Sequence, residues 1–396
     1  MRSTLSSITL HFLHLELETA EDIVKKEYQI NQLQINSLGI IDFLLASSRP
    51  IFSVIMAFLV SGVIILIQGI NPIDAFSAII RGAFGNIGSI ANTCVRATPL
   101  LIGALGMTLG IRGGIFNVGA EGQLYIGAAA ATTVGLLPLP VPSWLHITLS
   151  LIAGILGGSL FAVLPAFLKA YRGISEIVVT IMLNFVGIYF VSYLIHEPNL
   201  IGKADASYAQ SRDILPSAAL PVLIKGTSLH FGIIIAVVLA LILFSVLKYS
   251  RFGYRTRMVG ANPEAAHYVG VNVKRSIFTT FLMVGGFSGL MGAVEILGFK
   301  HSIFDYFSGG LGYDTVAVSL LGGVNPLGVI VSAFFFGSLR AGGNLMQQTV
   351  GVSTYMVQVI QALVVLFIVG IGFMKPRIRK QKSTTLQPIE TNNLEG

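Results

Sequence analysis

Long stretches of apolar residues, each separated from the next by a short polar break, run through most of this 396-residue chain. About 20 apolar residues suffice for a helix to cross the hydrocarbon core of a bilayer, and tilted or interrupted helices can be shorter. Hydrophobic residues make up 54% of the sequence and charged residues 11%, whereas a soluble domain carries about 25% charged residues. We therefore expect an all-α, polytopic membrane helical bundle with about ten transmembrane segments. These segments are expected near residues 51–67, 97–111, 122–137, 146–168, 174–196, 231–248, 276–298, 308–322, 325–345 and 355–373.

A stretch of polar and glycine residues, RGGIFNVGAEGQ at 112–123, interrupts this pattern between two apolar segments. A nucleotide-binding loop would need a preceding strand or a Lys-Ser/Thr pair at the Walker spacing, and the stretch has neither. We expect a helix that ends at Arg112, a turn through Gly113 and Gly114, and a second helix with Glu121 in its first turn, where the helix dipole favours an acid. The stretch therefore predicts a hairpin embedded in the membrane.

Two of the expected segments, 122–137 and 308–322, are short and rich in glycine. Such backbone is tolerated at membrane depth only where protein or a water-filled cavity surrounds it, so these two are predicted to be broken or re-entrant helices. Glycines four residues apart inside other segments allow helices to approach closely, because lipid supplies no hydrophobic force between helices. These pairs are Gly106 and Gly110, Gly154 and Gly158, and Gly285 and Gly289.

Polar side chains inside apolar segments are the next clue, because they are costly in lipid and face the bundle interior or a cavity. Glu176, Thr180 and Asn184 follow one another at intervals of four and so form one stripe of a helix. The stripe predicts either hydrogen bonding between helices or a position near a substrate path, and Glu176 can also lie at the helix end near Lys169. Further ionisable residues within apolar stretches are Arg96, Glu295 and Asp314.

Lysine and arginine collect in the 249–275 loop and in the segment after residue 374. Cytoplasmic loops of membrane proteins carry an excess of these residues, whereas the charges of the 197–230 loop are balanced, as the rule permits outside. Ten segments with both termini in the cytoplasm satisfy these assignments. This topology accounts for the net charge of +7 better than nucleic-acid binding, because no stacking aromatics are interleaved with the basic residues.

The ends of the chain differ from the transmembrane domain expected at 49–375. Residues 1–48 mix acidic, basic and apolar residues without the continuous apolar core of a signal peptide, so we expect a cytoplasmic N-terminal extension, either an amphipathic helix or a loose segment. Residues 376–396 are polar and are expected to form a disordered cytoplasmic tail.

The sequence GANPEAAHYVGV contains the signals of a short helix inside the basic 249–275 loop. Asn262 suits the N-cap, Pro263 the first helical position, Glu264 the positive end of the dipole, and Gly270 the stop. A helix of about two turns is marginal by itself in water, so it is expected to dock on a partner or to lie at the membrane surface. The small side chains of its two central alanines suit insertion into a cleft on a partner.

Four separated stretches resemble the motifs of permease subunits of ATP-binding-cassette (ABC) importers of the branched-chain amino acid and simple-sugar class, most closely the nucleoside-type permeases served by basic membrane lipoproteins. These stretches are RGGIFNVGAEGQLYIGA, SEIVVTIMLN, GANPEAAHYVGV and SLLGGVNPLG, in this order. The resemblance covers roughly residues 50–375. The N-terminal extension is longer than such permeases lead us to expect.

The resemblance implies a permease subunit in the cell membrane that moves a small polar solute, a nucleoside or a simple sugar, by alternating access. It also implies three partners: a separate ABC ATPase, a second homologous permease in a heterodimer, and an extracytoplasmic solute-binding lipoprotein. The chain itself would hold no ATPase site, no metal and no cofactor, because ATP and Mg are used by the ATPase partner.

The resemblance also assigns roles to residues. The segment that couples such permeases to the ATPase corresponds here to Asn262, Pro263, Glu264, Ala265, Ala266 and Gly270. The glycine-rich stretches at 112–122 and 319–328 correspond in two related halves, and irregular segments in matched positions indicate a substrate path between the halves. The candidates for lining that path are Asn117, Glu121, Asn184 and Asn325.

Other functions stay open from the sequence. A secondary transporter coupled to protons or sodium would share the helices and would use Glu121, Glu176 or Glu295, and an ABC permease for branched-chain amino acids would share every motif. A membrane enzyme is disfavoured, because no His/Asp/Glu cluster has metal-ligand spacing and no nucleophile has an evident base. An ion channel is disfavoured because no carbonyl-filter motif is present. The single cysteine, Cys94, excludes a disulfide within the chain.

Overall fold

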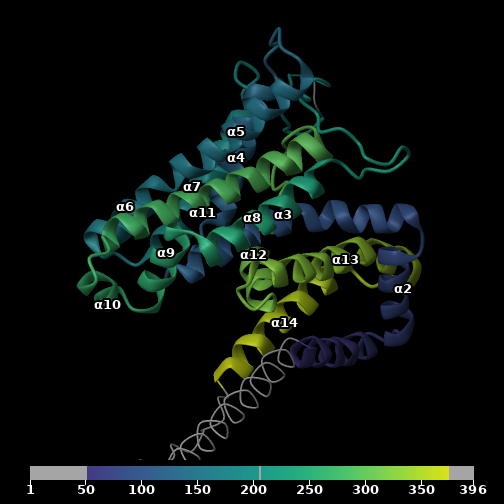
Figure 1. Cartoon of the computed structure of the whole chain (residues 1–396). Helices are drawn as coiled ribbons and strands as arrows, with labels where there is room; N and C mark the ends of the chain where they lie inside the picture. Colours follow the sequence, from purple (N-terminus) through teal and green to yellow (C-terminus); the bar gives the residue numbers. More distant parts are fainter. Residues whose placement is uncertain (1–50, 205–206, 374–396) are drawn as a thin grey trace, which may run out of the picture.

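The computed structural model describes residues 51–204 and 207–373, and in this part of the chain nearly all regular structure is helical (Figure 1). Within the same residues, β-structure is limited to isolated bridges near the 197–230 loop. The expected extension at 1–48 and the expected tail at 376–396 lie outside the described residues. The helices are Ile51–Ile67, α2 (Pro72–Phe84), α3 (Ile87–Arg112), α4 (Ala120–Gly135), α5 (Ser143–Phe161), α6 (Val163–Arg172), α7 (Glu176–His196), α8 (Gly232–Tyr249), α9 (Arg251–Ala261), α10 (Pro263–Tyr268), α11 (Val273–Glu295), the π-helix η1 (Ile296–Lys300), α12 (Leu311–Leu321), α13 (Pro326–Val350) and α14 (Tyr355–Phe373).

The predicted fold class is confirmed, and a helix is found at every expected apolar segment. In the described chain six helices are long and apolar enough to cross a membrane, so the count of ten spans is not confirmed. The two segments expected to be broken are indeed short, with 16 residues in α4 and 11 in α12. The sequence reading missed α2, which begins with Asn71 as N-cap and Pro72 at the first helical position.

The centre of the bundle is built around α11, which packs against α3, α4 and α5, and α4 also packs against α5. Every residue of α3 from Ala97 to Gly110 is buried, so this part of the helix has no face left for lipid. The outer helix α7 distributes its polar and apolar residues in the opposite way to a helix of a soluble protein. It buries a stripe that contains Glu176 and Asn184, and it exposes large apolar residues such as Phe185 and Phe190. This arrangement is expected where the surrounding solvent is lipid.

Glycines allow α4, α5 and α11 to cross at backbone contact, as the glycine pairs predict. A Cβ added at Gly285 of α11 would lie 2.6 Å from the carbonyl oxygen of Gly158 on α5. A Cβ at Gly289 would lie 2.9 Å from Cα of the same Gly158, and one at Gly127 of α4 would collide with the backbone of Gly289. The close packing of these three helices therefore depends on the absence of side chains.

The turn between α3 and α4 lies beside the turn between α12 and α13. Whereas α12 packs on α13, α3 and α4 do not pack along each other, so the predicted turn is present but the predicted hairpin is not confirmed. The first turn contains Gly114 with a φ of +73°, as predicted for this stretch. Arg112 Nε at the end of α3 donates to the carbonyl oxygen of Val324 in the second turn at 2.9 Å. The 197–230 loop lies at the opposite end of the long helices from α9 and α10 (Figure 1). The matched glycine-rich stretches thus meet in space.

Candidate functional site

An interruption between η1 and α12 brings non-helical backbone into the interior of the bundle. The segment from His301 to Gly310 contains two of the three non-glycine residues with positive φ in the described chain, His301 at 60° and Tyr306 at 55°. Such conformations are uncommon and cluster at functional positions. The side chain of Phe307 from this segment packs on Tyr125 of α4, with ring centroids 4.7 Å apart. The segment is partly enclosed by protein: Ile303, Phe307 and Ser308 are buried, whereas Tyr306 is 68% exposed.

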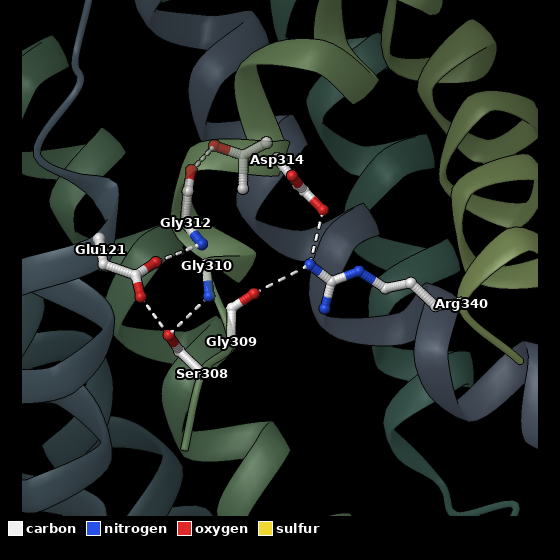
Figure 2. A network of polar contacts seen from close by, with 8 residues as sticks. Glu121, Ser308, Gly309, Gly310, Gly312, Asp314 and Arg340 are labelled. Atoms are coloured by element: carbon white, nitrogen blue, oxygen red, sulfur yellow. Dashed lines mark hydrogen bonds and ion pairs between the residues drawn. The ribbon is translucent and has the colours of Figure 1, made fainter. Parts of the chain in front are cut away.

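Glu121 joins the start of α4 to the start of α12 (Figure 2). Its carboxylate accepts a hydrogen bond from the hydroxyl of Ser308 and another, at 2.7 Å, from the backbone N–H of Gly312. The first N–H groups of a helix have no partner within the helix, and lipid supplies none. Glu121, which is 3% exposed, meets this need for α12. The glycine at 312 is required here, since a Cβ would lie 2.5 Å from Cα of Glu121.

An ion pair holds the other side of the same helix start. Arg340 of α13 donates to the carboxylate of Asp314 at 2.6 Å and to the carbonyl oxygen of Gly309 at 3.3 Å (Figure 2). Both side chains are mostly enclosed, and a buried charge without a partner would be strongly destabilising. The start of α12 is therefore fixed from α4 on one side and from α13 on the other.

A second cluster of charged side chains, Lys300 and Glu295, lies at η1. Lys300 Nζ lies 3.5 Å from the carboxylate of Glu295, donates to the carbonyl oxygen of Phe307, and lies 4.9 Å from the centre of the Phe304 ring. π-Helices occur mostly as single turns at functional positions. Here the π-turn places a lysine over the interrupted segment.

Arg96 of α3 approaches the same turn. Its guanidinium carbon lies 5.0 Å from the centre of the Phe299 ring, a cation–π contact. Its buried Nε has no hydrogen-bond partner in the residues that the structure describes. Arg96 also interacts electrostatically with Glu295 and Arg340, so the Lys300–Glu295 pair and the Arg340–Asp314 pair are adjacent.

His230 closes the outer edge of η1, where the 197–230 loop enters α8. Its ring is 2% exposed, and Nδ1 accepts a hydrogen bond from the N–H of Gly232 at 3.2 Å. Burial, with a smaller contribution from His301, lowers the pKa of His230 to about 4. The ring is therefore uncharged at neutral pH and packs as a neutral side chain.

The predicted stripe on α7 does face other helices. Glu176 forms an ion pair with Lys169 at 2.7 Å, as one reading of the sequence proposed. Asn184 accepts from the N–H of Gly122 at 2.8 Å and donates to the carbonyl oxygen of Val118 at 3.0 Å. Asn184 thus hydrogen-bonds the start of α4, which confirms the bonding between helices. Its position on a substrate path stays a prediction.

Asn117 lies in the turn between α3 and α4, and Asn325 lies in the turn between α12 and α13. Asn117 donates to Gln123 at 2.8 Å and accepts from the N–H of Gly119 at 3.0 Å. Asn325 caps α13 by accepting from the N–H of Leu327 at 3.1 Å. Both amides therefore have structural partners within the chain, and a role in lining the path stays a prediction for both.

Three residues of this site, Lys300, Ser308 and Arg340, were not singled out from the sequence. A signal was present for Arg340, because it lies inside an apolar segment like the residues that were noted. Ser308 carried none, since serine is frequent in membrane helices. The sequence did single out Arg96, Glu121, Glu295 and Asp314, and the structure brings these together.

The short helix in the basic loop exists as α10, Pro263–Tyr268. The side chain of Asn262 accepts from the N–H groups of Glu264 and Ala265, both at 3.0 Å, which is the predicted N-cap. Gly270 takes a φ of +82° just beyond its end. The cap and the stop predicted for this helix are confirmed, while its coupling role is a separate question.

One expectation for α10 is wrong. Ala266 is fully buried within the chain, and its carbonyl oxygen accepts from the N–H of Val271 at 3.0 Å. It faces the protein's own α9 and α11, so its small size serves packing within the chain and not insertion into a partner. The free face of α10 instead presents Ala265 and Tyr268, and Tyr268 is 89% exposed.

Comparison with known proteins identifies the family of this chain. Residues 89–369 match the family described as the permease component of the branched-chain amino acid transport system. The chain belongs to this family. It is a multi-pass membrane protein and the permease subunit of an ABC importer, so the helices described above are those of a transport subunit.

Three curated relatives are similar to this permease over most of their length. The guanosine ABC transporter permease protein NupP of Bacillus subtilis (strain 168) is 32% identical, over 84% of this chain and 96% of the relative. A glucose ABC transporter permease protein of Haloferax volcanii is 30% identical, over 87% and 92%. The nucleoside ABC transporter permease protein NupB of Lactococcus lactis subsp. cremoris is 29% identical, over 81% and 89%. None of the solved structures matches the permease significantly.

Proposed function

We propose that this permease imports a nucleoside, and that guanosine is among its substrates. The observation that carries the proposal is the similarity to NupP, which is named for guanosine and is matched along 96% of its length. A second relative, NupB, is named for nucleosides. Simple sugars are the second candidate, because the glucose permease protein of Haloferax volcanii is nearly as similar.

The start of α12 is the proposed centre of the transport path. In transporters, interrupted helices with N-terminal ends near the middle of the membrane provide substrate sites between related halves. Here α12 starts inside the bundle, held by Glu121 and Arg340, and the turn at its end contacts the turn that follows α3. We propose that alternating access moves α12 and α13 relative to α3 and α4 around this point.

The proposed assembly contains three further proteins: a separate ABC ATPase, a second permease and a solute-binding lipoprotein. Two Lactococcus lactis permease proteins, NupB and NupC, both named for nucleosides, are similar to this chain, which supports a heterodimer. ATP and Mg would act on the ATPase subunit alone, and this chain would have no enzymatic role. Both termini and the 249–275 loop would be cytoplasmic in the cell membrane.

Uptake in proteoliposomes tests the substrate. The permease, its partner permease and the ATPase are reconstituted with ATP enclosed, and labelled guanosine is supplied with the cognate lipoprotein outside. We expect ATP-dependent uptake that unlabelled nucleosides reduce and glucose or leucine does not. Competition by glucose or leucine, without competition by nucleosides, would overturn the proposal.

Orientation can be tested by cysteine labelling at Tyr208 in the 197–230 loop, a residue that is 62% exposed. In a background in which Cys94 is replaced by Ala, Tyr208→Cys is expected to react with a membrane-impermeant maleimide in intact cells. Tyr268→Cys on α10 is the matched variant and is expected to react only after the cells are opened. The opposite pattern would invert the topology.

Coupling to the ATPase is predicted to use the free face of α10. Replacement of exposed Ala265 by Trp is expected to leave the permease folded but to reduce co-purification of the ATPase, or solute-stimulated ATP hydrolysis, by about tenfold, because bulk enters an interface without room. Ala266→Trp is the contrasting variant and should instead lower the yield of folded permease, since that side chain is buried. Normal ATPase binding and coupling in Ala265→Trp would return α10 to a role as a connector at the membrane surface.

A further inference from the structure

We propose that Arg96 recognises the imported solute and that it does so by hydrogen-bonding the two adjacent acceptors of a guanine base, O6 and N7. The inference deepens the proposed nucleoside import and rests on it. It assigns to one side chain the preference for guanine over adenine nucleosides.

The first observation is that Arg96 is left without a partner. Among the charged groups at the interruption, Lys300 lies beside Glu295 and Arg340 is paired with Asp314. In the described part of the chain, Arg96 has neither a hydrogen bond nor an ion pair; it contacts the Phe299 ring, and its electrostatic interaction with Glu295 is not a direct contact. A guanidinium inside a membrane protein without such partners is costly and is a functional site by default.

The second observation is that Arg96 is only partly buried. The side chain is half-buried, and Nε is enclosed, so the accessible part is the terminal fork of the guanidinium. Lipid is excluded as the neighbour of such a group, because an arginine at membrane depth faces the bundle interior or a water-filled cavity. The contact with the Phe299 ring uses the face of the guanidinium and no N–H group, so the terminal N–H groups stay available to donate two parallel hydrogen bonds.

The third observation is the charge of the surroundings, which selects the class of solute. The groups with formal charge at the interruption are three cations and four acids: Arg96, Lys300, Arg340, Glu121, Glu295, Asp305 and Asp314. Because the acids outnumber the cations, the site favours a neutral solute with acceptor atoms over one that brings a further carboxylate. A planar fork matches the O6 and N7 acceptors of guanine, whereas adenine presents a donor at the position of O6.

The test compares variant with wild-type permease for three solutes at saturating concentrations of solute and lipoprotein. Taking the ratio of variant to wild-type uptake rate for each solute cancels the preference of the lipoprotein itself. Arg96→Met is expected to lower guanosine uptake about tenfold, the value of a bidentate pair, and to lower uptake of adenosine and of 7-deazaguanosine, which lacks the N7 acceptor, much less. Arg81→Met, at an exposed position of α2, is the control and should match wild type for all three.

A second variant keeps the proposal testable if Arg96→Met does not fold. Arg96→Lys retains the charge but not the fork, so it should assemble normally and lose the preference for guanosine. Equal loss for all three solutes in a folded variant, or no loss at all, would overturn the recognition role while leaving nucleoside import intact. Absence of nucleoside uptake by the wild-type protein would instead refute the proposed function, and the role of Arg96 with it.

Discussion

Replacement of Gly289 by Leu is expected to eliminate folded permease from the membrane. A Cβ at this position would lie 2.9 Å from both Cα and N of Gly158 on α5, and these are backbone atoms that cannot move aside as a side chain can. Overpacking of a core costs about 1–3 kcal/mol where side chains can adjust. Here α4, α5 and α11 would have to separate, so we expect a loss beyond the upper end of that range.

The measurement is the amount of monodisperse permease in a detergent extract, followed by size-exclusion chromatography of a fluorescently tagged chain. Gly370→Leu in α14 is the matched control, because a Cβ there meets nothing within 4 Å. The control should give wild-type yield, and Gly289→Ala an intermediate one. A wild-type yield and elution profile for Gly289→Leu would show that α5 and α11 do not cross at backbone contact.

Replacement of Glu121 by Leu is expected to abolish transport and reduce assembly. The change leaves the N–H of Gly312 and the hydroxyl of Ser308 without their acceptor, at a position that is buried within the chain. One unsatisfied buried group costs about 1–3 kcal/mol, and this loss falls at the start of α12, which the proposed mechanism moves. We therefore expect uptake to fall by more than about tenfold even in the fraction that assembles.

Glu121→Gln keeps the size and shape of the side chain and removes only its charge. Its amide oxygen can accept from Gly312, and its amide nitrogen can donate to Ser308, so assembly should be retained and transport only partly reduced. Glu197→Leu is the control, because in the described structure its carboxylate makes no hydrogen bond or ion pair. Uptake by Glu121→Leu at the wild-type rate, at equal protein amount, would remove this carboxylate from the mechanism.

Much of the fold follows from local patterns in the sequence. Apolar stretches of spanning length indicate the helices, because lipid permits only backbone that is hydrogen-bonded within the segment. The turn at Gly114 and the Asn262 cap of α10 are equally local, since each depends on residues only a few positions apart. The inward stripe on α7 follows from the helical period and the cost of polar groups in lipid.

The composition and the period of the sequence therefore determined that this protein is a helical membrane bundle, which segments are interrupted, and which polar residues avoid lipid. Only the tertiary structure decided which partner each of these residues has. Ser308 and Glu121 are 187 residues apart, and nothing near either of them in the chain indicates the other. The same holds for inward-facing Ala266 and for unpaired Arg96, because a helical pattern shows that a side chain faces other helices but not which helix lies opposite it.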